Sequence, residues 1–114
     1  MKTNSGSDSW EHQYQQLVAS LADTGYISQG SVLDRSTLRP PRSGYQWTRK
    51  LARKTVTVAL SAEQYSGLRQ AVKNRRRLQQ TIKKMERLSR KILFGSLPDT
   101  RRRKHLDKKV LGLI

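Results

Sequence analysis

Apolar side chains recur at helical spacing near the start of the chain. Their separations of four, three and four positions place on one helical face the residues Trp10, Tyr14, Leu17 and Leu21. Asp8 or Ser9 is suited to cap the start of such a helix, and Gly25 lies just past its end. We therefore predict a helix over residues 9–23, after a disordered lead over residues 1–8, with its apolar face packed in the core.

The next stretch, residues 27–60, has β character. Residues 27–38 are a candidate strand, and Pro40, Pro41 and Gly44 mark a loop. Polar residues alternate with aromatic ones over residues 45–50 and with β-branched ones over residues 55–60, which predicts a β-hairpin. The connection, about residues 51–54, contains neither glycine nor asparagine, so we expect a four-residue or bulged loop rather than a tight primed turn.

A long helix is predicted over residues 62–94. Ser61 and Gln64 form a capping-box pattern at its start, Gly95 is suited to end it in the left-handed conformation, and Pro98 prevents continuation. Its apolar stripe, interrupted by two polar positions, consists of Leu68, Ala71, Leu78, Ile82, Met85 and Ile92. Either the first helix or a second copy of the chain could pack on this stripe.

The far end of the stripe carries the first prediction about partners. The first helix offers too short an apolar face to cover the whole stripe, and the β-sheet can cover the part near Leu68. Met85 and Ile92 would then be exposed, so we expect self-association or docking on a larger partner through them.

These patterns predict an α+β fold. A short N-terminal helix and a long basic helix pack around a three-stranded antiparallel sheet or hairpin, in one small domain over residues 9–97. A basic tail over residues 98–114 follows, with Asp99 as a plausible N-cap, in which Leu106, Val110 and Ile114 could line a short helix after residues 101–104.

Composition adds a strong and uneven positive charge. The 114 residues include 24 Lys or Arg and 8 Asp or Glu, a net charge of +16, and only 34% are hydrophobic. Residues 1–44 contain four basic and four acidic residues, whereas residues 45–114 contain twenty basic and four acidic ones. Such segregation predicts a dedicated contact surface for a polyanion.

Several function classes are excluded or disfavoured. The absence of cysteine rules out disulfides, a thiolate nucleophile and zinc sites that need sulfur ligands. His12 and His105 belong to no paired motif, and no phosphate loop, metalloprotease motif or nucleophile elbow is present. We expect a protein that is not an enzyme and holds no cofactor or metal. The polar N-terminus and the lack of a long apolar run predict a cytoplasmic protein, nucleoid-associated if bacterial.

Three basic clusters are the candidate nucleic-acid-binding sites. The hairpin cluster is Arg49, Lys50, Arg53 and Lys54. The helix cluster is Lys73, Arg75, Arg76 and Arg77, continued by Lys83, Lys84, Arg87, Arg90 and Lys91. The tail cluster is Arg101, Arg102, Arg103 and Lys104, followed by Lys108 and Lys109. A solvated surface is the alternative for each, but acids are too scarce for a helix stabilised by surface ion pairs.

Two aromatic residues beside the hairpin cluster have two interpretations. Tyr45 and Trp47 share one sheet face, where they could stack the bases of a single strand. Packing against a helix is the commoner role of such a pair.

The order of these features resembles a family of small basic bacterial proteins of uncharacterised activity. The matching segments are residues 30–33 (Gly-Ser-Val-Leu), 44–47 (Gly-Tyr-Gln-Trp), 55–58 (Thr-Val-Thr-Val) and 75–78 (Arg-Arg-Arg-Leu), within residues 13–94. The resemblance implies a short helix, a β-meander and a long terminal helix, and an accessory product of a mobile element. Relatives often carry a cysteine cluster before the Gly-Tyr strand, which residues 36–43 lack here.

The sequence thus predicts a nucleic-acid-binding accessory or architectural factor. Double-stranded DNA is favoured over RNA, with the long helix and the tail neutralising phosphates and the hairpin tip in a groove. A basic structural subunit that packs on RNA or on an acidic protein is the alternative, and binding to anionic lipid is a third.

Overall fold

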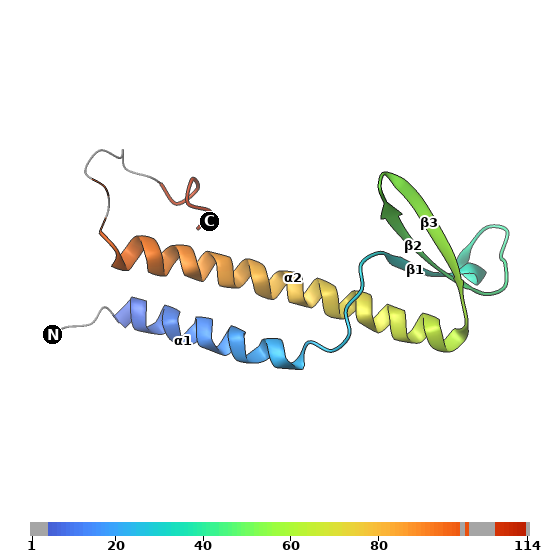
Figure 1. Cartoon of the computed structure of the whole chain (residues 1–114), viewed down its shortest axis with the longest axis horizontal. Helices are drawn as coiled ribbons and strands as arrows, with labels where there is room; N and C mark the ends of the chain where they lie inside the picture. Colours follow the sequence, from blue (N-terminus) through green and yellow to red (C-terminus); the bar gives the residue numbers. More distant parts are fainter. Residues whose placement is uncertain (1–4, 99, 101–106, 114) are drawn as a thin grey trace. The chain divides into compact units, whose positions relative to one another are not determined.

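The computed structural model describes residues 5–98, 100 and 107–113 (Figure 1). The chain divides into two compact units, and the single domain over residues 9–97 stays a prediction of the sequence. Unit 1 combines residues Met1–Asp23 with Gln79–Ile114, and unit 2 comprises Thr24–Leu78. The α+β fold is confirmed, with an N-terminal helix, a three-stranded antiparallel sheet and a long helix, α2, that contributes to both units.

In unit 1, helix α1 (Ser5–Ser20) continues into a 3-10 turn, η1 (Leu21–Asp23). The predicted apolar stripe is confirmed, because each of its four members is half-buried while most residues between them are exposed. The predicted start is wrong, since α1 already includes Ser5 and places Asp8 in its first turn rather than at a cap. Asp8 still favours the helix there, because a carboxylate near a helix N-terminus is stabilised by the helix dipole.

Helix α2 (Ala62–Ser96) supplies the partner of α1 in unit 1 (Figure 1). The two run antiparallel, since Trp10 lies near Gly95 while Leu17 lies near Leu88. Gly95 does not end α2, which corrects the prediction of a left-handed terminator. A Cβ at Gly95 would lie 3.3 Å from Cζ3 of Trp10, so this glycine allows the indole ring to approach the helix closely.

Unit 2 contains the sheet, in the order β1 (Ser31–Asp34), β2 (Tyr45–Leu51) and β3 (Lys54–Leu60), all antiparallel. The expected strand over residues 27–38 is reduced to β1. A 3-10 turn, η2 (Arg35–Thr37), follows β1, and the segment before β1 binds α2 instead of a strand. The amide of Ser28 donates to the carbonyl of Ala71 (3.2 Å), and Nδ2 of Asn74 donates to the carbonyl of Tyr26 (2.8 Å).

The hairpin that β2 and β3 form is confirmed, but the predicted long loop is wrong. Leu51 pairs directly with Lys54, which leaves a two-residue turn, Ala52-Arg53. Both turn residues have positive φ, 49° and 70°, as a type I′ turn requires. This conformation costs about 1–2 kcal/mol for each residue other than glycine. The ladder of seven residue pairs, whose twist only a primed turn matches, outweighs that local preference.

Replacing Ala52 with asparagine is expected to stabilise unit 2 by about 0.5–1 kcal/mol, because asparagine tolerates the left-handed conformation better than alanine. Urea unfolding measures the change. The matched control is Ala19→Asn in α1, which should destabilise, because asparagine has a lower helix propensity than alanine. Equal effects of both substitutions would contradict the turn conformation.

The start of α2 has the predicted capping box. Oγ of Ser61 accepts from the amide of Gln64 (3.1 Å), and Oε1 of Gln64 accepts from the amide of Ser61 (3.0 Å). One turn later, the ring of Tyr65 stacks on that of Tyr45, with centroids 4.4 Å apart. This contact places the face of the sheet that carries Tyr45 and Trp47 on the side of α2.

The apolar core is small. Among the described residues the buried apolar side chains are Ala71 and Val72 in unit 2 and Leu88 in unit 1. Met85 and Ile92 are half-buried rather than exposed, because α1 packs on this end of α2. The exposed apolar residues there are instead Leu93, Phe94 and Leu97. Leu106 and Ile114 lie outside the described residues, and residues 107–113 form turns rather than the expected short helix.

Candidate nucleic-acid interface

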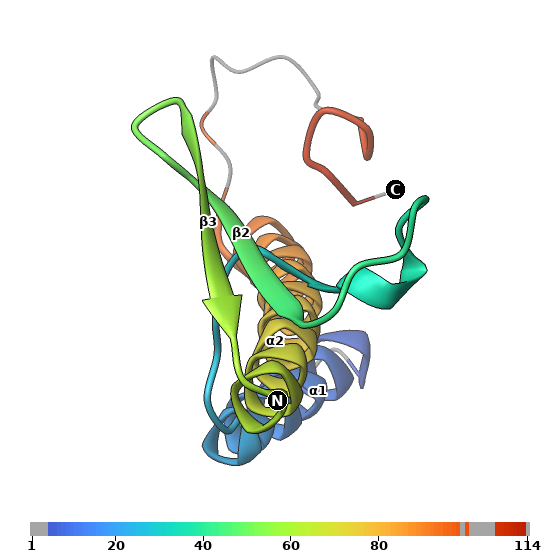
Figure 2. The ribbon, with the colours of Figure 1, turned by 90° about the vertical axis from the view of Figure 1, so that its right-hand side faces the viewer.

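The hairpin cluster surrounds the two-residue turn of unit 2. Figure 2 shows the turn end of the hairpin projecting away from the first part of α2. Lys50, Arg53 and Lys54 are exposed, and Arg49 is half-buried. Because side chains alternate along a strand, Lys50 lies on one face of the ribbon and Arg49 with Lys54 on the other. The cations therefore cover both faces and the end of the hairpin, and residues 45–60 contain no acid.

Arg49 and Trp47 form a stacked pair beneath this tip. The guanidinium carbon of Arg49 lies 5.2 Å from the centroid of the Trp47 ring. Nε1 of Trp47 donates to the carbonyl of Gln29 (2.9 Å), which fixes the indole. Nε of Arg49 is buried and has no hydrogen-bond partner in the described part of the chain. The stack holds this guanidinium against the apolar face of the ribbon while its other nitrogen atoms can contact a partner.

The two aromatic residues proposed for base stacking have intramolecular contacts. Tyr45 stacks on Tyr65, and Trp47 lies under Arg49, and both Tyr45 and Trp47 are half-buried. Packing within unit 2 explains both rings, and their role in stacking bases stays a prediction.

The part of the helix cluster that belongs to unit 2 presents three exposed cations. Lys73, Arg76 and Arg77 are exposed and lie on one helical face, because they are three and four positions apart, whereas Arg75 is half-buried. Nη2 of Arg77 donates to Oδ1 of Asn74 (3.1 Å). This arrangement is suited to contacts with a row of phosphates.

Asn74 is the residue of this region that the sequence analysis missed. Its side chain is 7% exposed and accepts from Nε2 of Gln70 (2.9 Å) as well as from Arg77. Together with its bond to the carbonyl of Tyr26, these contacts tie the chain before β1 to α2 and orient Arg77. A lone asparagine inside a basic helix gives no sequence signal for a contact 48 residues away.

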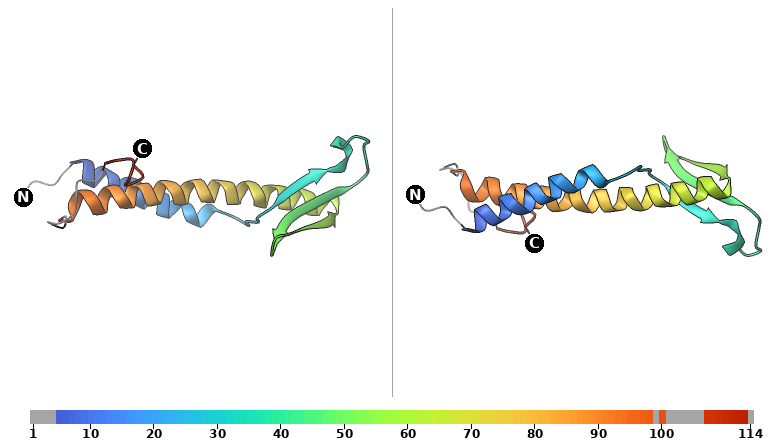
Figure 3. Two further views of the ribbon diagram at one scale, coloured as in Figure 1. Left: turned by 90° about the horizontal axis from the view of Figure 1, so that it is seen from above. Right: turned by 90° about the horizontal axis from the view of Figure 1, so that it is seen from below.

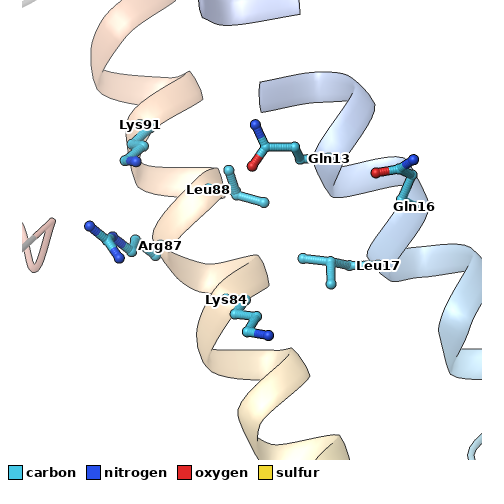
Figure 4. A pocket seen from close by; sticks show the side chains of 7 residues that line it. All are labelled: Gln13, Gln16, Leu17, Lys84, Arg87, Leu88 and Lys91. Carbon is cyan, nitrogen blue, oxygen red and sulfur yellow. The ribbon is translucent and has the colours of Figure 1, made fainter. Parts of the chain in front are cut away.

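Three members of the helix cluster in unit 1, Lys84, Arg87 and Lys91, line a groove of about 340 Å³ between α1 and α2 (Figure 4). Leu17 and Leu88 point toward each other at its floor, and Lys84 extends toward α1, whereas Arg87 points away from α1. The groove is lined by Gln13, Gln16 and Leu17 from α1 and by Lys84, Arg87, Leu88 and Lys91 from α2, so its α2 side is cationic. An anionic group would fit this side better than an apolar ligand.

Three of the five helix-cluster cations in unit 1 have structural contacts. Arg87 donates to the carbonyl of Leu113 (2.7 Å) and Arg90 to that of Gly112 (3.0 Å), so both hold the C-terminal turn. Nζ of Lys91 lies 5.8 Å from the centroid of the Trp10 ring. Lys83 and Lys84 are exposed and make no hydrogen bond or ion pair within the described residues. These two are the better candidates for phosphate contact.

The tail cluster cannot be placed in this site. Arg101, Arg102, Arg103 and Lys104 lie outside the described residues, and Lys108 and Lys109 are exposed in the C-terminal turn. Their contribution stays a prediction.

Unit 2 is strongly positive, because residues 24–78 contain twelve basic and only two acidic residues. Hydrogen bonds from the hydroxyl (2.7 Å) and the amide (3.0 Å) of Ser36 hold the pKa of Asp34 below its usual value, so this carboxylate stays ionised at neutral pH. Within residues 5–98 and 107–113 no cluster of three or more His, Cys, Asp or Glu could hold a metal ion. No helix in the same residues is long and apolar enough to span a bilayer.

Comparisons of the chain with protein-family models, with curated proteins and with solved structures find no match. The proposals below therefore rest on the chain's own residues.

Proposed function

We propose that this protein binds nucleic acid, with duplex DNA as the main ligand, through the basic tip of the β2–β3 hairpin. The observation that carries the proposal is the hairpin itself, with four basic residues and no acid around a two-residue turn. A ribbon of this kind is suited to a polyanion because every exposed charge on it has the same sign.

The dimensions of the hairpin fit a DNA groove. Two paired strands lie about 5 Å apart, and the major groove is about 12 Å wide and admits a two-stranded ribbon. Arg53 is at the end of the turn, where a guanidinium could reach a guanine O6 and N7 pair. Lys50 and Lys54, on opposite faces, are placed for the phosphates of the groove walls.

The exposed cations of α2 supply the second part of the mechanism. Lys73 and Arg76 in unit 2, and Lys83 and Lys84 in unit 1, would neutralise phosphates without reading bases. An accessory or architectural factor of modest sequence preference needs this division, because few of its contacts carry base information.

Paired substitutions in unit 2 test the division of roles. Lys50→Ala with Arg53→Ala should reduce the preference between a good and a poor duplex by about 10–100-fold, since the base contact of Arg53 contributes about 1–3 kcal/mol, and the loss of the Lys50 phosphate contact should also weaken every duplex. Lys73→Ala with Arg76→Ala should weaken every duplex by about the same factor, because phosphate contacts are independent of sequence. Fluorescence anisotropy with labelled duplexes at physiological salt measures both.

Arg39→Ala with Arg42→Ala is the charge-matched control, since both residues are exposed in the loop before β2. It should change affinity far less than either test variant. If the hairpin double lowers all affinities uniformly, groove reading by the tip is wrong. If the loop double is as damaging as the hairpin double, net charge alone explains binding.

A second candidate function is that of a basic subunit in a larger assembly, packed on RNA or on an acidic protein. The small core favours it, since no large side chain among the described residues is fully buried, and Tyr26, Leu97 and Val110 are 91%, 56% and 68% exposed. Competition among duplex DNA, single-stranded DNA, structured RNA and anionic liposomes separates the candidates. Tight binding to structured RNA alone would replace the first proposal with this one, and preference for liposomes would indicate a lipid surface.

A further inference from the structure

The edge strand β3 is the feature that points beyond nucleic-acid binding. In the order β1-β2-β3, the two edges of the sheet, which Figure 3 shows from two sides, belong to β1 and β3. β1 has only four residues and runs into η2. β3 has seven residues, contains no proline or bulge, and pairs with β2 without interruption. It lacks the usual protections of an edge strand except for one charge, Lys54, at its first position.

The hairpin register determines which backbone groups of β3 are open. In a two-residue hairpin the closing pair, here Leu51 and Lys54, exchanges both backbone hydrogen bonds, and bonded pairs then alternate along the ladder. The amides and carbonyls of Thr55, Thr57 and Ala59 therefore point away from β2. These three residues make no backbone hydrogen bond to any other described segment. They form a row of donors and acceptors ready for another strand.

We infer that β3 pairs antiparallel with β3 of a second copy of this chain, about a two-fold axis at Thr57. In this register Thr57 faces its own copy and Thr55 faces Ala59 of the other chain. The backbone amides and carbonyls of all three outward residues of each strand then form hydrogen bonds with the other strand. No other antiparallel register pairs every open backbone group of both strands.

The side chains are self-complementary in the same register. Val56 opposes Val58 of the other copy, on the apolar face of the sheet that also carries Trp47. Val58 is 41% exposed in the single chain, so pairing would cover part of an apolar surface that now faces water. The exposed residues Thr55, Thr57 and Ala59 meet on the opposite, polar face.

Charge favours a second copy paired antiparallel. The only charge in β3 is Lys54, and it would lie opposite Leu60 of the partner copy rather than opposite its own equivalent. The two Lys54 residues would be six positions apart along the sheet, or about 20 Å, more than twice the Debye length of about 8 Å at about 0.15 M salt. Parallel pairing in register would instead bring the two hairpin clusters together.

Sedimentation of the full chain without nucleic acid tests the inference independently of the proposed function. We expect a dimer for the wild type and a monomer for Thr57→Pro. Proline removes an outward backbone donor and no backbone bond to β2, and the only contact with β2 lost besides is the one between the hydroxyls of Thr57 and Thr48 (3.3 Å). Thr55→Lys with Ala59→Lys should also give a monomer, since the substituted lysines would oppose each other across the pairing. Gln79→Lys with Gln80→Lys adds the same charge on exposed positions of α2 and should remain dimeric.

An introduced cysteine reports the register, because the chain has none of its own. Thr57→Cys should form a covalent dimer under mild oxidation, since Cα atoms of a bonded antiparallel pair lie about 5.5 Å apart, within disulfide range. Ser66→Cys, exposed on α2, is the control for random collision and should cross-link far more slowly. A monomeric wild type would overturn the inference. A dimer that survives both β3 variants but is lost in Leu93→Glu would also overturn it, in favour of the exposed apolar end of α2.

Discussion

Raising the salt concentration from about 50 to about 200 mM is expected to weaken the binding of duplex DNA by about three to four orders of magnitude. The reason is counterion release. A protein that neutralises about 6–8 phosphates should give a slope of log K against log[salt] of about −5 to −7. The described candidates for these contacts are the exposed cations Lys50, Lys54, Lys73, Arg76, Lys83 and Lys84.

A titration by fluorescence anisotropy on a single duplex gives this slope directly. Lys73→Gln with Arg76→Gln should make the slope shallower by about two, because each lost phosphate contact lowers it by about one. The loop double Arg39→Ala with Arg42→Ala should leave the slope unchanged. A wild-type slope shallower than about −2 would mean that the basic clusters are mostly not in contact with phosphates.

Substitution of Gly30 by alanine is expected to destabilise unit 2 by about 3 kcal/mol. Gly30 has a φ of +98°, and a Cβ there would lie 2.6 Å from both the carbonyl oxygen of Thr48 and Nε1 of Trp47. Backbone strain of this kind costs about 1–3 kcal/mol, and the overpacking costs about as much again. Displacing the indole would also weaken its hydrogen bond to Gln29 and its stack with Arg49.

Urea unfolding, followed by the fluorescence of Trp47 in a Trp10→Phe background, measures this loss for unit 2. Gly67→Ala is a matched control, because this glycine lies in α2 with no atom within 4 Å of the added Cβ. It should stabilise the helix by about 0.5–1 kcal/mol. A Gly30→Ala midpoint equal to that of the wild type would contradict the close approach of β2 to this residue.

Local patterns predicted most of the secondary structure. The apolar stripe of α1, the reciprocal cap of Ser61 and Gln64, and the alternation along β2 and β3 all depend on residues within a few positions of each other. Predictions that relied on the presence or absence of a single glycine or asparagine were less successful. Gly95 lies inside α2, where the absence of a side chain lets the ring of Trp10 approach the helix closely. Ala52-Arg53 forms a primed turn without glycine, because the pairing of β2 with β3 leaves only two residues for the connection.

The candidate site was likewise predicted only in part from the sequence. Sequence located the basic clusters, because charge density is visible along the chain. It could not distinguish cations held by intramolecular contacts from exposed ones. Arg49 stacks on Trp47, and Arg87 and Arg90 bind carbonyls of the C-terminal turn, whereas Lys50, Arg53 and Lys83 are exposed. These partners lie up to 26 positions apart, so no local pattern contains them.

By itself, then, the sequence determined the α+β class, the hairpin and the segregated positive charge, since helix and strand periodicity and charge are properties of neighbouring residues. Only the tertiary structure decided that α1 packs on the Leu88 end of α2, that Asn74 ties residue 26 to the helix, and that β3 is an open edge. Each of these depends on which of several compatible surfaces meet, and that choice is made by packing and hydrogen bonding between distant segments.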